Sequence, residues 1–526
     1  MDGTLSRDLI SVIILAAIAS TPWGRKILVA LKTSEKDKRE KAALEFEPVA
    51  YPNSNSLASA HFAADAALKQ AGLFLGRGWR IGETQSNRVF RYGGPGHLIL
   101  ISPSRTGKMV SVLCAALLER PNPIASRLII DPKGELCAIT HARAAKFSEV
   151  VAIDPFGTLK KHGVRGVKCV GFNPLAPFDP KDVSFGGDVE CVTDGTFVHE
   201  KGSGDNAAFF NDSAALLYST GIRTLLKYGR PEQKNLVAVR EEICRDVFGF
   251  AKRYVNCGDE FVRDELSRYT SKLAPQSKSL EDILSTFRTQ TSFIGLEGIR
   301  ESLMDDGVRA LDLKRRPMTV YFILPLDKLP TPAVKWFRLG MSTWLCEFLK
   351  AGPKGLPVLC VCDEFYSVCA GGPMKIFQTA MSQAAGAANL QLWPVLQDLA
   401  QLETLAPNQG WRTFLSNTAV KIFFGGSMLD KETSEYISEL CGEREIVVHS
   451  RSLHRDRRTK EIEVSNGAST VWQRLMQPHE VRRMHEGMIV FCEKVSGPIL
   501  AKRRPYFEIP EFRGQYLPNP YYKRGR

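Results

Sequence analysis

Short, continuous apolar runs alternate along most of the chain with longer stretches in which apolar residues recur every three or four positions. The early runs are HLILIS, RLIID and VVAID, and the late ones are TVYFILP, VLCVCDE, LQLWPVLQ, VKIFFGG and MIVFCE. Such runs, rich in β-branched residues, are typical of strands buried on both faces of a mainly parallel sheet with helices between them. The pattern therefore predicts an α/β fold.

The alternation of apolar runs with helical stretches is interrupted between FNPL, at 172–175, and PMTVYF, which starts at residue 317. Within this gap, residues 206–229 and 272–290 repeat apolar residues at helical spacing. The gap is about as long as a small domain, so we expect an all-helical insertion at residues 178–310. A polar segment at residues 449–463, HSRSLHRDRRTKEIE, predicts a solvated loop or a hairpin.

The N-terminal region carries one strongly apolar run, LISVIILAAIAS, at residues 9–20. It is shorter than the roughly 20 residues (range about 17–25) that a spanning helix needs. Basic residues follow the run, which favours a cytoplasmic location for the bulk of the chain. The alternatives are an amphipathic helix, buried or interfacial, and a cleaved signal peptide, which the non-basic start disfavours. We take residues 1–32 as a candidate membrane anchor and residues 33–58 as a linker.

The amino-acid composition limits the possible functions and partners of this protein. With 44% hydrophobic and 24% charged residues, the chain has the composition of a folded globular protein. Its formal charge of +13 favours anionic partners such as nucleic acid or a phospholipid surface. The twelve cysteines form no pair of C-x-x-C motifs, and the nine histidines form no i, i+4 pair. We therefore expect reduced thiols in a cytoplasmic compartment and no metal site built by side chains alone.

A candidate phosphate loop follows the first predicted strand of the α/β pattern. Such a loop reads G-x-x-x-x-G-K-[ST] between a strand and a helix, so that backbone N–H groups surround the phosphates. Here Ser102 replaces the first glycine and Met109 replaces the hydroxyl residue that contacts magnesium. Lys108 would neutralise the β and γ phosphates. The alternative is a chance Gly-Lys pair in a loop. The candidate nucleotide-binding residues are Ser102, Pro103, Ser104, Arg105, Thr106, Gly107, Lys108 and Met109.

Two adjacent carboxylates end the apolar run VLCVC. Asp363 could hold Mg²⁺ through water, and Glu364 could orient and deprotonate the attacking water of nucleotide hydrolysis. The alternative is an Asp-Glu pair that only caps a helix. We expect Lys108 and the two carboxylates to converge at adjacent strand tips around one triphosphate.

At this point the chain resembles the coupling proteins of type IV secretion and conjugation systems. The resemblance begins near residue 58 and depends on the order and spacing of several motifs rather than on any one of them. These are ASAHFA at 58–63, SPSRTGK at 102–108, DPKGEL at 131–136, AIDPFG at 152–157, FNPL at 172–175, DEF at 363–365, LQDLAQL at 396–402 and SEYISELCGER at 434–444.

The resemblance implies a membrane-anchored hexameric ATPase that uses ATP and Mg²⁺. Its RecA-like P-loop nucleotide-binding domain, residues 59–177 and 311–526 with a basic C-terminal tail, would be interrupted by the all-helical insertion. Gln397 would lie at the end of the strand beside the one that carries Asp363 and would sense the γ phosphate; the alternative is a surface amide. Asp131 and Glu135 match another recurrent motif of the family, or they form a turn.

The chain also departs from the family pattern. Residues 379–393 contain no arginine or lysine, whereas family members usually carry there an arginine that acts across the subunit boundary. Turnover would then be slow, or another residue such as Arg412 would serve instead. Relatives generally have two spanning helices, and this chain offers one short candidate.

The leading hypothesis is an ATP-dependent coupling protein at the cytoplasmic face of the bacterial inner membrane. It would form a homo-hexamer, recruit single-stranded DNA with its relaxase, or effector proteins, and deliver them to a type IV secretion channel. The second hypothesis is a docking receptor that binds nucleotide but hydrolyses it poorly. The third is a soluble DNA-translocating motor unrelated to secretion.

Overall fold

The computed structural model describes residues 26, 50–52, 59–198, 205–272, 277–370, 372–455 and 462–521. The chain divides into two compact units: Met1–His61 with Cys441–Leu475, and Phe62–Leu440 with Met476–Arg526. The candidate anchor at 1–32 and the linker at 33–58 lie almost entirely outside the described residues. Among the described residues, no helix has the length and apolar character needed to cross a membrane.

The larger unit is built on a twelve-stranded sheet with the order β3-β2-β15-β14-β11-β4-β10-β9-β5-β8-β6-β7. The eight strands from β11 to β7 pair in parallel, whereas β14, β15, β2 and β3 extend one side of the sheet in antiparallel pairs. The α/β expectation is therefore confirmed. The bounds are β2 Trp79–Thr84, β3 Val89–Tyr92, β4 His97–Ile101, β5 Ser126–Asp131, β6 Glu149–Ile153, β7 Lys168–Cys169, β8 Met318–Ile323, β9 Val358–Cys362, β10 Leu390–Leu396, β11 Thr418–Phe424, β14 Gly487–Cys492 and β15 Ile499–Lys502.

The central strands follow the apolar runs of the sequence because they are covered on both faces. Every residue of β4, β5, β8 and β9 is buried. The elements that connect or flank the strands are α3 Asp65–Gln70, η1 Met109–Leu113, α4 Cys114–Leu118, α5 Glu135–Ala144, α6 Thr158–Lys161, α14 Lys335–Ala351, α15 Phe365–Val368, α16 Lys375–Ala387, α17 Leu399–Leu405, α18 Gly410–Ser416, α19 Lys431–Cys441 and α20 Pro478–Arg483.

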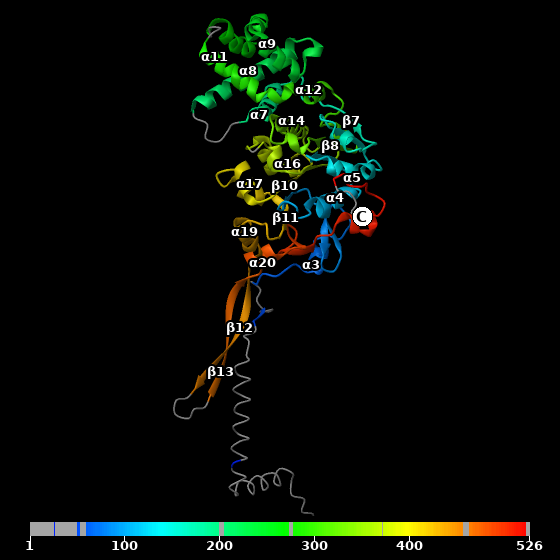
Figure 1. Ribbon diagram of the computed structural model, residues 1–526, viewed down its shortest axis with the longest axis vertical. Helices are drawn as coiled ribbons and strands as arrows, with labels where there is room; N and C mark the ends of the chain where they lie inside the picture. Colours follow the sequence, from blue (N-terminus) through cyan, green and yellow to red (C-terminus); the bar gives the residue numbers. More distant parts are fainter. Residues whose placement is uncertain are drawn as a thin grey trace, which may run out of the picture. The chain divides into compact units, whose positions relative to one another are not determined.

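Between β7 and β8, all regular elements in the described part of the chain are helices. The two helices predicted from spacing are α8 (Asp205–Tyr228) and α11 (Lys278–Gln290), and they pack together with α9 (Leu236–Tyr254) (Figure 1). The others are α7 Phe185–Thr196, α10 Glu260–Ser267, α12 Glu297–Met304 and α13 Asp312–Arg315, with the short helical turns η2 Pro231–Gln233, η3 Arg268–Lys272 and η4 Ser292–Gly295. Their apolar sides are buried, as the 3.6-residue period requires.

The smaller unit contains a three-stranded antiparallel sheet in which β12 (Glu443–Arg455) pairs with β1 (Ala50–Pro52) and β13 (Ile462–Arg474). The described residues of the polar segment, 449–455 and 462–463, therefore lie in the paired strands of a long hairpin, one of the two alternatives predicted. This hairpin belongs to the same compact unit as the N-terminal residues. We had expected it to be part of the nucleotide-binding domain, because it lies within the range 311–526.

Candidate nucleotide-binding site

The candidate phosphate loop leaves the end of β4 and enters the helical turn η1. Ser102 N–H donates to Leu396 O of the neighbouring strand β10 at 2.9 Å, and Thr106 Oγ1 donates to Pro103 O at 2.7 Å. The left-handed positions in the loop are Arg105, with φ 61°, and Gly107, with φ 86°. Ser102 does not have a positive φ, so the missing first glycine costs the loop no backbone strain.

Lys108 lies among the predicted carboxylates. Its Nζ is 3.1 Å from Glu364 Oε1, to which it donates a hydrogen bond, and 4.0 Å from Asp363 Oδ1. Gln397 Nε2 donates to the other oxygen of Glu364, Oε2, at 3.1 Å. Residues separated by up to 289 positions in the sequence thus form one contiguous cluster, which is the feature a shared triphosphate site requires.

One geometric expectation is wrong. We expected Lys108 and the carboxylates at adjacent strand tips, but β10 lies between β4 and β9. Gln397 follows β10, and this strand does pair in parallel with β9, as predicted. Lys108 nevertheless reaches Glu364 directly, and Gln397, which follows the intervening strand, contacts the other oxygen of the same carboxylate.

Glu364 adopts an unusual backbone conformation where β9 turns into α15. Its φ and ψ of 51° and 47° lie in the left-handed region, which costs a residue with a side chain about 1–3 kcal/mol. Asp363 N–H meanwhile donates to Ile130 O of the next strand at 3.1 Å. The turn places the Glu364 carboxylate between Lys108 and Gln397. The strained residue is therefore the one that makes both hydrogen bonds of the cluster.

The two neighbouring carboxyl groups have opposite pKa shifts. Burial raises the pKa of Asp363 to about 6, although Lys108 opposes the shift. Burial also acts to raise the pKa of Glu364, but the charge of Lys108 and hydrogen bonds from Lys108 and Gln397 outweigh it and lower that pKa. Glu364 is therefore the more strongly ionised group, and Lys108 is its counter-ion.

Asp363 is the residue best suited to contact a metal ion. Its Oδ1 is buried and accepts no hydrogen bond, which leaves a carboxylate oxygen available for a hard cation. The described residues contain no group of three or more His, Cys, Asp and Glu side chains that could hold a metal by themselves. The side chain of Met109 offers no oxygen, and the Ser111 hydroxyl donates to Gly107 O at 2.9 Å. The donor set thus fits Mg²⁺ only if nucleotide and water oxygens complete the coordination.

The other residues singled out from the sequence have different surroundings. Asp131, at the end of β5, accepts hydrogen bonds from Glu135 N and Cys137 N at 3.1 and 2.8 Å and so caps α5. Burial raises the pKa of Asp131 to about 7. Arg412 is exposed on α18, with its guanidinium 5.3 Å from the ring centroid of Trp411, and takes no part in the Lys108 cluster.

Sequence reasoning missed two basic residues. Lys133 lies near enough to the carboxylates for its charge to lower the pKa of both Asp363 and Glu364. Its place in the motif DPKGEL was a usable signal. Arg503 Nη1 donates to Thr106 O in the phosphate loop at 3.1 Å, across nearly 400 residues of sequence. No local pattern identifies this contact, because it depends on β15 lying on the same side of the sheet as the loop.

A parallel sheet of RecA-like type, with a loop lysine beside a strand-end Asp-Glu pair, is the arrangement of P-loop proteins. The family model for type IV secretory system conjugative DNA transfer matches residues 53–522, and the chain belongs to this family.

Two named proteins align with most of this chain. The chain is 24% identical to protein VirD4 of Rhizobium radiobacter over 425 residues, 78% of this chain and 57% of that protein. It is 24% identical to the conjugal transfer protein TraG of Escherichia coli over 444 residues, 80% of this chain and 66% of that protein. The chain therefore spans less than two thirds of the length of these relatives.

Solved structures support the fold. The bacterial conjugative coupling protein TrwB, in complex with sulphate, aligns with a TM-score of 0.60 at 15% identity, covering 86% of this chain and 95% of that one. TrwB in complex with ADP and Mg²⁺ aligns with a TM-score of 0.59 at 16% identity, covering 88% and 97%.

Proposed function

We propose that this protein is a coupling ATPase that binds ATP with Mg²⁺ at the Lys108 cluster and uses hydrolysis to pass cargo to a type IV secretion channel. The observation that supports the proposal is the contact of Lys108 with Glu364 and of Glu364 with Gln397. Membership of the conjugative DNA transfer family supplies the biological setting. The complex of TrwB with ADP and Mg²⁺ agrees with the proposed ligands.

The cluster suggests how binding would prepare hydrolysis. Lys108 is the counter-ion of Glu364, at 3.1 Å. An incoming triphosphate carries more negative charge than one carboxylate, so Lys108 would turn to the phosphates and leave Glu364 available to accept a proton from water. Gln397 would hold Glu364 in place through its amide. Mg²⁺ would be held by Asp363 and would neutralise charge on the phosphates.

The eight residues 102–109 would surround the phosphates, chiefly through backbone N–H groups at the start of η1. In this proposal residues 59–177 and 311–526 form the nucleotide-binding part, apart from the hairpin, and residues 178–310 form the helical insertion. Proposed partners are single-stranded DNA with relaxase, or effector proteins, and channel components. Assembly would be a homo-hexamer at the cytoplasmic face of the bacterial inner membrane.

ATP turnover and ATP affinity of the full chain test the proposal. We expect Lys108→Ala to weaken ATP binding at least 10-fold. We expect Glu364→Gln to keep binding within a few-fold and to lower kcat by about 100-fold or more, the usual contribution of a general base. Lys160→Ala, an exposed lysine on α6, is the matched control and should behave as wild type.

The second candidate is a docking receptor that binds nucleotide and hydrolyses it poorly. It is favoured by Met109 in place of a hydroxyl residue and by the absence of arginine and lysine from residues 379–393. Equal turnover in wild type, Lys108→Ala and Glu364→Gln, with cargo binding retained, would support the receptor over the motor. Fractionation wholly with cytosol in cells that contain the channel would instead favour a soluble DNA motor.

A further inference from the structure

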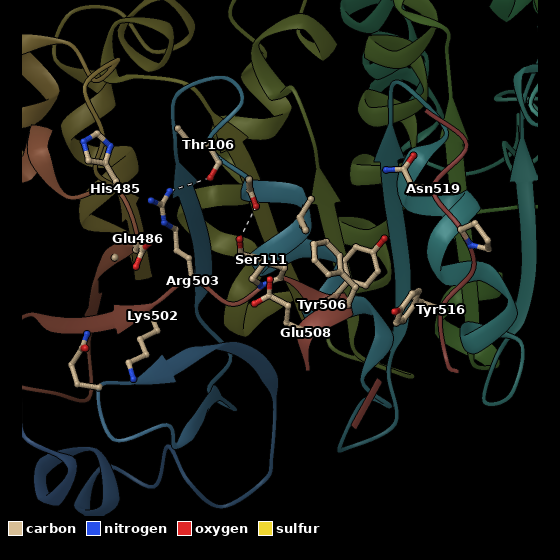
Figure 2. A pocket seen from close by; sticks show the side chains of 17 residues that line it. Thr106, Ser111, His485, Glu486, Lys502, Arg503, Tyr506, Glu508, Tyr516 and Asn519 are labelled. Atoms are coloured by element: carbon tan, nitrogen blue, oxygen red, sulfur yellow. Dashed lines mark hydrogen bonds between the residues drawn. The ribbon is translucent and has the colours of Figure 1, made fainter. Parts of the chain in front are cut away.

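A large cavity opens beside the phosphate loop, on the flank away from the carboxylates. Its volume is about 1300 Å³, above the roughly 300–1,000 Å³ usual for small-molecule pockets. Thr106, Gly107, Val110 and Ser111 form one wall, so the cavity begins where the loop turns into η1 (Figure 2). The opposite wall comes from β14, β15 and the C-terminal segment, residues 505–519.

The strand order explains why the loop has two different flanks. β4 lies between β11 and β10. On the β10 side are Gln397 and the carboxylates that follow β9. On the β11 side are β14 and β15, which contribute Gly487 and Lys502 to the cavity. A phosphate chain held over Gly107 therefore has carboxylates at one end and this cavity at the other.

The chemistry of the lining suits a nucleoside better than additional phosphates. Lys502 and Arg503 are accompanied by the carboxylates of Glu486 and Glu508, which would repel a second anion. Apolar groups of Val110 and two prolines are also present. Such a mixture of apolar surface with a few polar groups of both signs is typical of sites for a neutral, polar ring system.

The aromatic wall is held firmly. Tyr516 and Tyr506 meet edge to face, with ring centroids 4.8 Å apart and an interplanar angle of 80°. Tyr506 is buried, at 5% exposure, whereas Tyr516 is half-buried and faces the cavity (Figure 2). Next to Tyr516, Leu517 N–H donates to Ile139 O of α5 at 3.0 Å. A fixed ring with an accessible surface is what base stacking requires.

Arg503 connects this wall to the phosphate loop. Its guanidinium donates to Thr106 O at 3.1 Å and lies 4.7 Å from the ring centroid of Phe424. Asn519, farther along the same segment, donates to Glu135 of α5. The C-terminal segment is thus attached both to the loop and to α5, with the cavity between the attachments.

From this geometry we infer that the cavity is the nucleoside subsite: the base stacks on Tyr516 while the triphosphate extends over Gly107 to Lys108. The inference rests on the proposed function, because it places the rest of the same nucleotide. It adds that the C-terminal segment takes part in nucleotide binding, with Tyr516 as the residue that contacts the base.

Two probes separate the subsite from the phosphate site: ATP, and inorganic tripolyphosphate, which has no nucleoside. Their affinities for the full chain are measured by calorimetry. We expect Tyr516→Ala to weaken ATP binding by about 5- to 100-fold, the range for loss of one aromatic stack, and to leave tripolyphosphate binding unchanged. Tyr516→Phe, which keeps the aromatic ring, should bind ATP as tightly as wild type. Leu517→Ala, next in sequence but outside the cavity lining, is the control and should bind both probes normally.

Each contrary outcome has a distinct meaning. Unchanged ATP affinity in Tyr516→Ala, with both probes lost in Lys108→Ala, would overturn the subsite and leave the proposed function standing. Equal weakening of both probes in Tyr516→Ala would also overturn it, because the effect would not depend on the nucleoside. Binding of neither probe by wild type would overturn the proposed function and the subsite together.

Discussion

Single residues decide how charge is balanced in the candidate site. Lys108 is the one cation in hydrogen-bonding contact with the Asp363–Glu364 pair among the described residues, and it is only 8% exposed. Glu364 in turn receives a neutral donor, Gln397, at its second oxygen. A neutral donor orients the carboxylate without competing with Lys108 for charge, which leaves the lysine free to exchange partners.

Replacement of Gln397 by leucine tests this role in the proposed ATPase. The variant keeps the volume of the side chain and removes the hydrogen bond to Glu364, so we expect kcat to fall about 10- to 100-fold. ATP affinity should change less than 3-fold, because binding depends on Lys108. Gln378→Leu, which removes a glutamine that donates to Leu405 O, is the control. A change in KM with unaltered kcat would assign Gln397 to binding instead.

His97 is a buried residue whose protonation state affects stability. Leu392 N–H donates to its Nδ1 at 3.0 Å, so Nε2 carries the proton that is donated to Ala380 O at 3.0 Å. Burial lowers the pKa of His97 from 6.5 to about 4. The unfolded chain therefore binds more protons than the folded chain between pH 6.5 and 4, and stability falls as the pH falls through this window.

We expect acidification from pH 7 to pH 5 to remove about 2 kcal/mol of stability through His97 alone. Urea unfolding at the two pH values measures the loss. His97→Asn keeps an acceptor for Leu392 N and does not titrate, so its loss between the two pH values should be smaller by that amount. An identical pH dependence in wild type and variant would show that other groups cause the acid sensitivity.

At the scale of elements, the helical segment that begins with Lys108 is fixed at its far end by β5. Arg127 is fully buried on β5, and its Nη1 donates to Leu117 O, in the last turn of α4, at 2.6 Å. Its Nη2 donates to Glu119 O just beyond the helix. A cation at a helix C-terminus satisfies the last carbonyl groups and interacts favourably with the helix dipole.

Arg127→Met should reduce the free energy of unfolding by about 2–4 kcal/mol, because two charge-assisted hydrogen bonds to backbone carbonyls, one buried and one part-buried, are lost. Thermal unfolding of the full chain measures the change. Arg120→Met, an exposed arginine beyond the same helix, is the control and should change stability by less than about 0.5 kcal/mol. Similar stability of the two variants would mean that solvent or neighbouring groups replace Arg127.

At the scale of the whole molecule, the candidate nucleotide-binding site and the β12–β13 hairpin belong to different units. The segments that flank the hairpin stay together without it, because Ser438 Oγ donates to Met476 O at 2.6 Å within the larger unit. The contacts of Lys108 with Asp363 and Glu364, and of Glu364 with Gln397, are all made by residues of the larger unit.

Replacing residues 443–474 with a short Gly-Ser linker should therefore leave ATP affinity within 2-fold of wild type. Calorimetry with ATP measures this, and thermal unfolding of the shortened chain verifies that the larger unit is intact. A shortened chain that unfolds normally but binds ATP more than 10-fold weaker would show that the hairpin supports the site.

Much of the architecture could be predicted from the sequence because it depends on local patterns. Apolar runs such as HLILI and VLCVC are strands, and the helical spacing in residues 206–229 corresponds to α8. Asp363 was singled out because it follows directly on an apolar run, Lys108 because it lies in a loop between a predicted strand and a predicted helix, and Gln397 through the resemblance to the coupling proteins. These inferences required only the order of residues along the chain.

Other features were decided by the tertiary structure. Strand order placed β10 between β4, which precedes the loop with Lys108, and β9, which precedes the carboxylates, and sequence order does not determine which parallel strands are neighbours. The contact of Arg503 with Thr106 and the cavity faced by Tyr516 join segments about 400 residues apart. The sequence by itself determined which side chains could carry phosphate chemistry. Only the packed sheet determined their neighbours, because those contacts arise from long-range pairing that no local periodicity encodes.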